Sequence, residues 1–388
     1  MRRARVGDVL QLERRPLAID PLKEYEPIGI RSFGKGIFHY PPTLGAELSK
    51  LRYFELRSDE LVVSNIKAWE GAIAVASGAE EGRVASNRFL SYAPIGGQID
   101  VRYAAYYFLS EQGLPLIQRA SPGSADRNRT LAIDRFENLV IPLPDIDDQR
   151  QIVARLDAVR ARVSLGNEAL EKSTRLSNAL PVAAAHREDM PISVKRAEGW
   201  SRVALREIME LQPDEVSVDP GATYPNAGIL SFSRGLFEKE PIDGATTSAR
   251  KLFRIRVGQF IYSRLFAFEG AYAVVDERFN GYYVSNEFPT FSLDTARTDP
   301  AFLAAYFGSP SVWRDLAVRS KGLGVRRQRV QPDAVLDYEI WLPPIEQQRQ
   351  VATTTKLVSA SDVTRSSMKA RLDALGAAAL NQAFAAPG

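Results

Sequence analysis

Two basic stretches of the sequence combine residue types that suit contact with a polyanion. The more basic one, Arg319 to Arg329, carries five cations, two glycines and no acid. Glycine lets a backbone approach a phosphate closely, and the planar arginine fork can bind a phosphate or the edge of guanine. The other stretch is the polar loop expected at residues 119–130. These stretches predict two nucleic-acid surfaces, with solvated basic loops as the alternative.

Further cations, serines and aromatic residues accompany each stretch. The first surface is predicted to contain Ser32, Lys35, Lys67, Arg88, Arg119, Arg127, Asn128 and Arg129. The second is predicted to contain Ser231, Arg234, Arg264, Arg319, Lys321, Arg326, Arg327 and Arg329. Trp69 and Phe268 lie among these residues in the sequence, and we expect both rings to belong to the core.

The residues give little indication of catalysis, metal binding or nucleotide binding. The chain has no cysteine, which excludes a thiolate nucleophile and a thiolate metal site. The spacing from Gly29 to Lys35 is that of a phosphate-binding loop, but Gly36 stands where a hydroxyl should hold magnesium. The two histidines, His39 and His186, lie far apart and are not repeated. We therefore expect no catalytic centre, no metal site and no cofactor in this chain.

Composition sets the broad class. The chain has 388 residues, 45% of them hydrophobic and 25% charged, which suggests two or three globular domains. The net charge is only +3, so a nucleic-acid surface must come from local clustering of cations. No apolar run approaches membrane length, and we expect a soluble, cytoplasmic protein with no membrane partner.

An internal repeat runs through most of the chain. The pair Leu143-Pro144 recurs as Leu342-Pro343, which is 199 positions later (342 − 143). The same offset relates residues 29–38 to 228–237, residues 68–72 to 267–271, and residues 86–89 to 285–288. A constant offset without a gap indicates two homologous domains, since chance matches would drift in register.

The repeat predicts an α+β fold in which two homologous globular domains are separated by two long antiparallel, coiled-coil-like connector helices, with a pseudo-twofold arrangement. Short apolar runs such as residues 61–63 predict strands within the domains. The expected boundaries are residues 1–145 for the first domain, 146–190 for the first connector helix and linker, 191–343 for the second domain, and 344–388 for the second connector helix.

The connector helices are predicted from the residues that follow each proline motif. Asp147 and Asp148 suit a helix N-terminus, and apolar residues then recur at intervals of four and three, as in a coiled-coil seam that Gly166 interrupts. This helix is expected to end near Leu180, before Pro181, and to be roughly 50 Å long. The residues expected to form partner-binding surfaces are Gln149, Ile152, Leu156, Val159 and Val163 in the first helix, and Gln348, Val351 and Val358 in the second. Residues 383–388 are expected to fray.

These features resemble the specificity (S) subunit of type I restriction–modification systems. The resemblance rests on the duplicated domain and on the motifs Ile141-Pro142-Leu143-Pro144 and Trp341-Leu342-Pro343-Pro344. It also rests on the helix starts Gln149–Ile152 and Gln348–Val351, and it covers nearly the whole chain. The first copy departs from the family at Asp145, where a second proline is usual.

The resemblance implies a function. Each globular part would be a target recognition domain that reads one half of an asymmetric, bipartite site in double-stranded DNA. The helices would dock two DNA methyltransferase (M) subunits that carry S-adenosylmethionine, and restriction (R) subunits would add cleavage with ATP and Mg. This chain would itself be non-catalytic.

Three other functions remain open at this stage. They are the recognition subunit of a type IIB-like system, a free-standing DNA methyltransferase or endonuclease, and a scaffold that uses only its helices. Cleavage of DNA by the purified chain with magnesium would identify the enzyme.

The most basic stretch yields the first testable prediction. Replacing Arg326 and Arg327 with alanine should weaken DNA binding by the assembled complex and reduce its salt dependence, since fewer phosphates are neutralised. A gel-shift titration at two salt concentrations measures both effects, and an unchanged affinity would contradict the assignment of this stretch.

Overall fold

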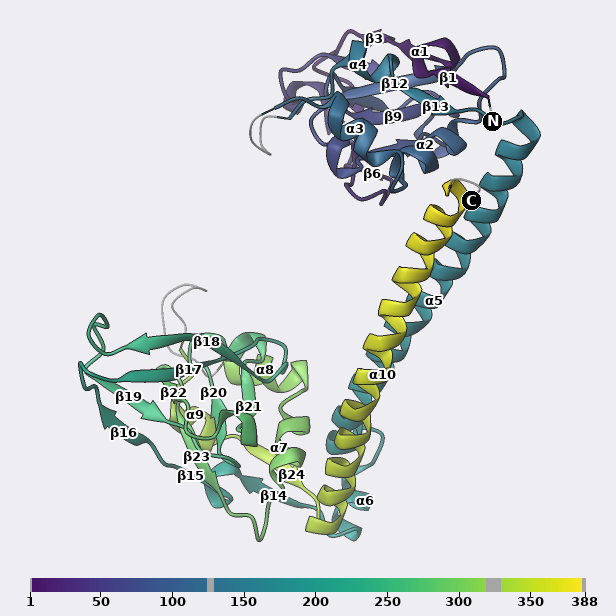
Figure 1. Ribbon diagram of the computed structural model, residues 1–388. Helices are drawn as coiled ribbons and strands as arrows, with labels where there is room; N and C mark the ends of the chain where they lie inside the picture. Colours follow the sequence, from purple (N-terminus) through teal and green to yellow (C-terminus); the bar gives the residue numbers. More distant parts are fainter. Residues whose placement is uncertain (1, 124–128, 319–328, 386–388) are drawn as a thin grey trace. The chain divides into compact units, whose positions relative to one another are not determined.

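The computed structural model describes residues 2–123, 129–318 and 329–385. The chain forms two compact units: Met1–Ala169 with Met368–Gly388 make unit 1, and Leu170–Ser367 make unit 2. Two long helices, α5 (Ile146–His186) and α10 (Ile345–Phe384), contribute residues to both units and are coloured teal and yellow in Figure 1. The α+β class and the two long helices are as predicted.

Unit 1 is built on a four-stranded antiparallel sheet in the order β10-β9-β12-β2, beside a three-stranded sheet in the order β11-β8-β3. The strands of these two sheets are β2 (Leu10–Glu13), β3 (Pro16–Leu17), β8 (Tyr53–Glu55), β9 (Leu61–Ser64), β10 (Ile73–Val75), β11 (Val84–Ser86) and β12 (Phe89–Pro94). The remaining strands pair as β1 (Arg3–Arg5) with β13 (Val140–Pro142), β4 (Glu24–Tyr25) with β7 (Thr43–Leu44), and β5 (Ile28–Ile30) with β6 (Ile37–His39). The helices are α1 (Val6–Val9), α2 (Val101–Leu109), α3 (Leu114–Ala120) and α4 (Ile133–Glu137).

Strand β9 shows why the first domain has two apolar layers. All four of its residues are buried. Successive side chains in a strand point to opposite faces, so Leu61 and Val63 join the cluster under α2 while Val62 joins a second cluster with Leu56 and Ala85. A continuous apolar run is what a strand covered on both faces requires.

Unit 2 repeats this order of strands. Its four-stranded sheet is β21-β20-β23-β15, and the three-strand order β22-β19-β16 is extended by the hairpin β17–β18 into five strands. The strands are β14 (Ser201–Ala204), β15 (Met209–Leu211), β16 (Asp214–Ser217), β17 (Thr223–Ile229), β18 (Leu236–Asp243), β19 (Lys251–Arg254), β20 (Phe260–Tyr262), β21 (Tyr272–Val274), β22 (Tyr283–Val284), β23 (Thr290–Leu293) and β24 (Glu339–Leu342), which pairs with β14. The helices are α6 (Ile192–Ala197), α7 (Pro300–Tyr306), α8 (Pro310–Val318) and α9 (Pro332–Leu336). The pseudo-twofold relation between the copies stays a prediction.

The predicted end of the first connector helix is wrong. Helix α5 continues through Pro181 to His186, although an interior proline removes one backbone hydrogen bond. Pro181 and Ala185 are buried, and Ala185 belongs to the core cluster of unit 2. The burial of the last turn therefore outweighs the missing bond, and the expected linker holds the short helix α6.

The expected interruption at Gly166 is also wrong, as is the expected fraying at residues 383 and 384, while residues 386–388 lie outside the described residues. In unit 1, a Cβ at Gly166 would lie 2.9 Å from Cδ1 of Leu372, so glycine allows α5 and α10 to approach closely. Helix α10 continues to Phe384, whose buried ring packs edge-on against Tyr103 and Tyr107 at 5.4 and 5.5 Å. The C-terminal turn is thus part of the core of unit 1.

A fully buried glutamine joins each domain to the helix that follows it. Oε1 of Gln149 accepts a hydrogen bond from the Asp100 amide at 2.9 Å, and its Nε2 donates to the carbonyls of Gln98 (3.0 Å) and Pro144 (2.8 Å). All the donors of this side chain are used. Gln149 is therefore not available to a partner, which corrects its assignment to a partner-binding surface.

Gln348 makes the same three contacts in unit 2. Oε1 accepts from the Asp299 amide at 2.8 Å, and Nε2 donates to the carbonyls of Arg297 (2.9 Å) and Pro343 (2.8 Å). The side chain is also fully buried, which corrects its partner-binding assignment as well. Leu156 and Val351 are buried in the cores of their units and Ile152 packs on one, so these three are structural residues too. Val159, Val163 and Val358 are half-buried along the helices.

Replacing Gln149 with leucine should lower the free energy of unfolding by about 1–3 kcal/mol, because buried backbone groups would lose their partner. Chemical denaturation measures the change. The matched control is leucine at Gln151, which is exposed on the same helix turn and should leave the midpoint unchanged. Equal midpoints for both variants would contradict the structural role of Gln149.

Candidate nucleic-acid interface

The frame of the first predicted surface consists of two turns that hydrogen-bond to each other. The hairpin tip between β5 and β6 donates from the Phe33 amide to the Glu70 carbonyl at 2.8 Å, and from the Gly34 amide to the Gly71 carbonyl at 2.9 Å. The acceptors belong to the 3-10 turn Ala68–Glu70 and the glycine after it. These bonds bring residues 32–35 beside residues 67–71.

Ser32 and Lys67, both predicted site residues, meet at the Glu70 carboxylate. Ser32 Oγ donates to Oε2 at 2.7 Å, and Lys67 Nζ lies 2.6 Å from Oε1. The hydrogen bond from Lys67, followed by that from Ser32, lowers the pKa of Glu70 below its usual value. The carboxylate keeps this network intact until the pH falls through that lowered pKa. Ser32 is thus a structural contact of the turn, and it is half-buried.

Trp69 carries a cation on its ring from each of two segments. Lys67 Nζ lies 5.1 Å and Arg129 Cζ 5.2 Å from the ring centroid, within cation–π range. The indole Nε1 donates to the Ile66 carbonyl at 3.2 Å. Trp69 is half-buried, as is its equivalent Phe268, so the expectation that both rings belong to the core is wrong. Each ring belongs to a 3-10 turn at the surface of its domain, and not to the buried face of a sheet or helix.

Backbone pairing around Asn65 brings further predicted cations to this place. The Asn65 amide donates to the Arg88 carbonyl at 2.8 Å, and its carbonyl accepts from Leu131 at 2.7 Å. Arg88 is exposed, and Arg129 precedes Leu131 by two residues. Lys67, Arg88 and Arg129 therefore come from three segments that meet at one residue.

Two other predicted cations lie near this cluster. Arg119 is exposed on helix α3, so its assignment to a loop is wrong; the neighbouring Gln118 donates to the Trp69 carbonyl at 3.3 Å. Lys35 is exposed at the hairpin tip, with Nζ 6.0 Å from the centroid of the Phe33 ring. Arg127 and Asn128 lie outside the described residues, as do Arg319, Lys321, Arg326 and Arg327 of the second surface.

The second domain keeps the frame and changes its side chains. Phe232 and Ser233 donate to the carbonyls of Glu269 (2.7 Å) and Gly270 (2.8 Å), and Ser231 Oγ donates to Glu269 Oε2 at 2.9 Å. However, the positions of Lys67 and Trp69 are taken by Phe266 and Phe268, on and beside the 3-10 turn Ala267–Glu269. The equivalent surface is therefore aromatic where the first is cationic.

The remaining described cations of the second surface all have hydrogen-bond partners, and one of them, Arg329, is neutralised by an ion pair. Arg329 pairs with Glu287 at 3.0 Å, and Glu287 stands at the position of Arg88 in the first copy. Arg264 Nη2 donates to Gln331 Oε1 at 2.7 Å. Arg234 is exposed and donates through Nε to the Ser231 carbonyl at 3.0 Å. The two domains therefore carry different side chains, and different charges, on the same backbone arrangement.

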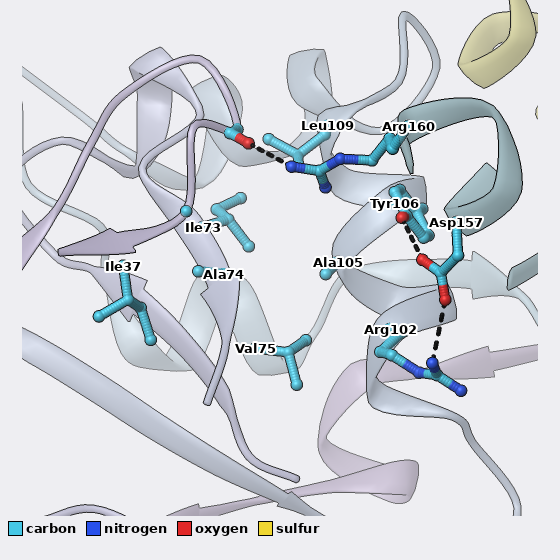
Figure 2. Close-up of a pocket in the computed structure, with 12 residues that line it drawn as sticks. Ile37, Ile73, Ala74, Val75, Arg102, Ala105, Tyr106, Leu109, Asp157 and Arg160 are labelled. Atoms are coloured by element: carbon cyan, nitrogen blue, oxygen red, sulfur yellow. Dashed lines mark hydrogen bonds and ion pairs between the residues drawn. The ribbon is translucent and has the colours of Figure 1, made fainter. Parts of the chain in front are cut away.

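A polar clamp fixes helix α5 to the first domain (Figure 2). Asp157 accepts from Tyr106 OH at 2.5 Å and from Arg102 Nη1 at 3.0 Å, and Arg160 Nη2 donates to the Gly34 carbonyl at 3.3 Å. These residues line a pocket of about 230 Å³ beside strand β10. Burial, with the Asp157 contact second, raises the pKa of Tyr106 to about 12, so its hydroxyl stays a donor. The clamp ties the hairpin tip itself to the helix.

The second copy lacks this clamp. The positions equivalent to Arg102, Tyr106, Asp157 and Arg160 hold Ala301, Ala305, Lys356 and Ser359. Unit 2 instead stacks His186, at the end of α5, on Tyr306 at 4.1 Å, and Nε2 of His186 lies 2.9 Å from the Tyr306 carbonyl oxygen. The two domains are held on their helices by different contacts.

Comparisons with known proteins agree with this architecture. No protein-family profile matches the chain, and no curated protein matches it in sequence. Among solved structures, a chain from a study of complex assembly and conformational transition of the type I R-M system is similar, with a TM-score of 0.66, 18% identity, and coverage of 99% of this chain and 97% of that chain. The HsdS subunit from Thermoanaerobacter tengcongensis is similar with a TM-score of 0.50, 20% identity, and coverage of 99% and 96%. The resemblance predicted from the sequence is confirmed at the level of the fold.

The described residues also limit which metal sites and membrane spans are possible. No group of three or more His, Asp or Glu side chains there is arranged to hold a metal ion. No helix in the same residues is long and apolar enough to cross a membrane.

The clamp yields a test by double-mutant cycle. Asp157→Ala and Tyr106→Phe should each destabilise the chain, with a coupling free energy of about 0.5–1.5 kcal/mol, because each removes one partner of the same bond. Denaturant titrations of the four proteins measure it. Lys356→Ala, at the equivalent position of the second copy, should leave the free energy of unfolding unchanged, and zero coupling between Tyr106 and Asp157 would refute the clamp.

Proposed function

We propose that the chain is the non-catalytic DNA-recognition subunit of a type I restriction–modification complex. Each repeated domain reads one half of a bipartite site in double-stranded DNA, and α5 and α10 set the distance between the half-sites. The observation that carries the proposal is the duplicated joint. A buried glutamine, Gln149 or Gln348, fixes each domain to the first turn of a long helix by three identical hydrogen bonds.

The difference between the two surfaces supports an asymmetric target. Lys67, Arg88 and Trp69 offer the first half-site cations and a ring, whereas Phe266, Glu287 and Phe268 stand at those positions in the second domain. Cations give strong, salt-dependent contacts to phosphates, while aromatic rings contact bases with little dependence on salt. The two half-sites should therefore differ in sequence and in how salt affects their recognition.

The helices supply a surface for partner proteins. Large apolar side chains are exposed along both of them, and such side chains can contribute to a protein–protein interface; they are Leu165, Leu176 and Leu180 on α5, and Leu357, Val363, Met368 and Leu375 on α10. We propose that two DNA methyltransferase subunits dock here and carry S-adenosylmethionine. Restriction subunits, with ATP and Mg, would complete the complex.

Lengthening both helices together tests the proposed function. Seven residues inserted after Ala169 and seven after Ser367 preserve the seam and lengthen each helix by about 10 Å. In the complex with its methyltransferase, the preferred spacer between half-sites should grow by about three base pairs, at 3.4 Å per base pair, with unchanged half-sites. Binding to DNAs of graded spacer length measures this shift.

The matched control inserts the heptad in α5 alone, which offsets the two helices and should disrupt the chain instead of shifting the spacer. If the double insertion left the preferred spacer unchanged, the helices would not set the distance.

A further inference from the structure

The two hairpin tips hold a phenylalanine in a backbone conformation that disfavours it. Phe33 has φ 61° and is followed by Gly34 at 65°; Phe232 has φ 62° and is followed by Ser233 at 50°. Asn and Gly adopt this left-handed conformation easily, whereas a bulky residue does so at a cost. The same costly choice occurs in both copies of the repeat.

Burial does not compensate for that cost. The Phe33 side chain is 75% exposed and Phe232 is 62% exposed, so both rings lie largely in water. Phe33 lines a groove with Leu109, Leu114 and residues of α5 and α10, and Phe232 meets Trp313 edge-on at 6.2 Å. A smaller residue would relieve the backbone and lose little packing, which points to a contact outside the chain.

Hydrogen bonds hold the backbone that carries each ring. The amides of Phe33 and of Gly34 donate to carbonyls of the neighbouring 3-10 turn and its following glycine, and the side chain of Ser32, the residue before Phe33, donates to Glu70 of that turn. Phe232, Ser233 and the Ser231–Glu269 bond form the same arrangement in unit 2. Because the backbone is fixed before binding, only the side-chain torsions of the ring remain to be ordered when it meets its partner, which lowers the entropy cost of the contact.

The surroundings of the rings favour a nucleic acid over an apolar protein surface. Each ring has an exposed cation two residues later, Lys35 in the first copy and Arg234 in the second. Arg31 adds a further exposed cation before Phe33. A cation beside an exposed ring is the combination that binds a phosphate and stacks on the adjoining base.

We propose that Phe33 and Phe232 are paired base-contact residues: each ring stacks against or wedges between bases of its half-site, while Lys35 or Arg234 binds the adjoining phosphate. This inference rests on the proposed function and adds to it a base-contacting residue in each domain. It also explains why neither position has the asparagine or glycine that its backbone favours.

The test uses Phe33→Asn and Phe232→Asn in the complex with its methyltransferase. Asparagine suits the left-handed backbone, so each variant should be as stable as the parent or more so, and should assemble normally. Affinity for the DNA that the parent selects should fall about 5- to 100-fold, the range expected for losing one stacked base. The salt dependence of binding should not change, whereas Lys35→Ala should reduce its slope by about one.

Fluorescence of 2-aminopurine, placed in each half-site in turn, adds an internal control. The parent complex should raise the signal in both half-sites as bases unstack. Phe33→Asn should abolish the rise in one half-site only and Phe232→Asn in the other only.

Three results would overturn the inference. If Phe33→Asn binds DNA like the parent, the ring does not contact a base, although the proposed function stands. If that variant fails to assemble with the methyltransferase, the ring is a protein contact. If the parent complex binds no DNA at all, the proposed function fails and this inference fails with it.

Discussion

The organisation of the molecule depends on a buried glutamine at the start of each long helix. Gln149 and Gln348 each accept from a backbone amide of their own domain and donate to two carbonyls, one of which belongs to the proline motif before the helix. A buried polar side chain with all of its donors used tolerates little rotation, because any movement leaves polar groups unpaired. Each joint therefore fixes the direction in which a helix leaves its domain, and the repeat uses that joint twice.

Around this common joint the two domains have diverged in the residues that face outward. The frame of two hydrogen-bonded turns is the same, but Lys67 and Trp69 become Phe266 and Phe268. The anchoring of each domain has diverged too, since Asp157 clamps the first domain to α5 and the stacking of His186 on Tyr306 serves in unit 2. The glutamine contacts are thus the same in both copies, whereas the outward-facing residues differ. This combination is what the proposed recognition of two different half-sites requires.

Sequence alone predicted the features that repeat along the chain. The offset between Leu143 and Leu342 predicted the α+β fold and its two long helices, because a gapless repeat is visible without structure. It also placed Ser32, Lys67 and Arg129 in one neighbourhood. Features that depend on contacts between distant residues were mispredicted. Helix α5 continues past Pro181 because its last turn is buried, and Gly166 makes room for Leu372.

Whether a given residue is exposed or buried was the hardest property to predict from the sequence. Gln149 is polar and near a helix start, which suggests exposure, yet its partners at Gln98 and Asp100 lie about fifty residues away in sequence and bury it. Phe33 is apolar, which suggests burial, yet it is exposed. The signal that could have identified it is its place between a serine and a glycine in a repeated turn, where asparagine is expected.

The central claim is that one chain reads two separate half-sites. Selection from a random-sequence DNA library by the complex with its methyltransferase tests this claim most directly. The account predicts two short, different sequence blocks separated by a spacer of fixed length and free sequence, and exchange of residues 191–343 for another recognition domain should change only one block. A single uninterrupted motif, or no enrichment by a complex that assembles normally, would contradict it.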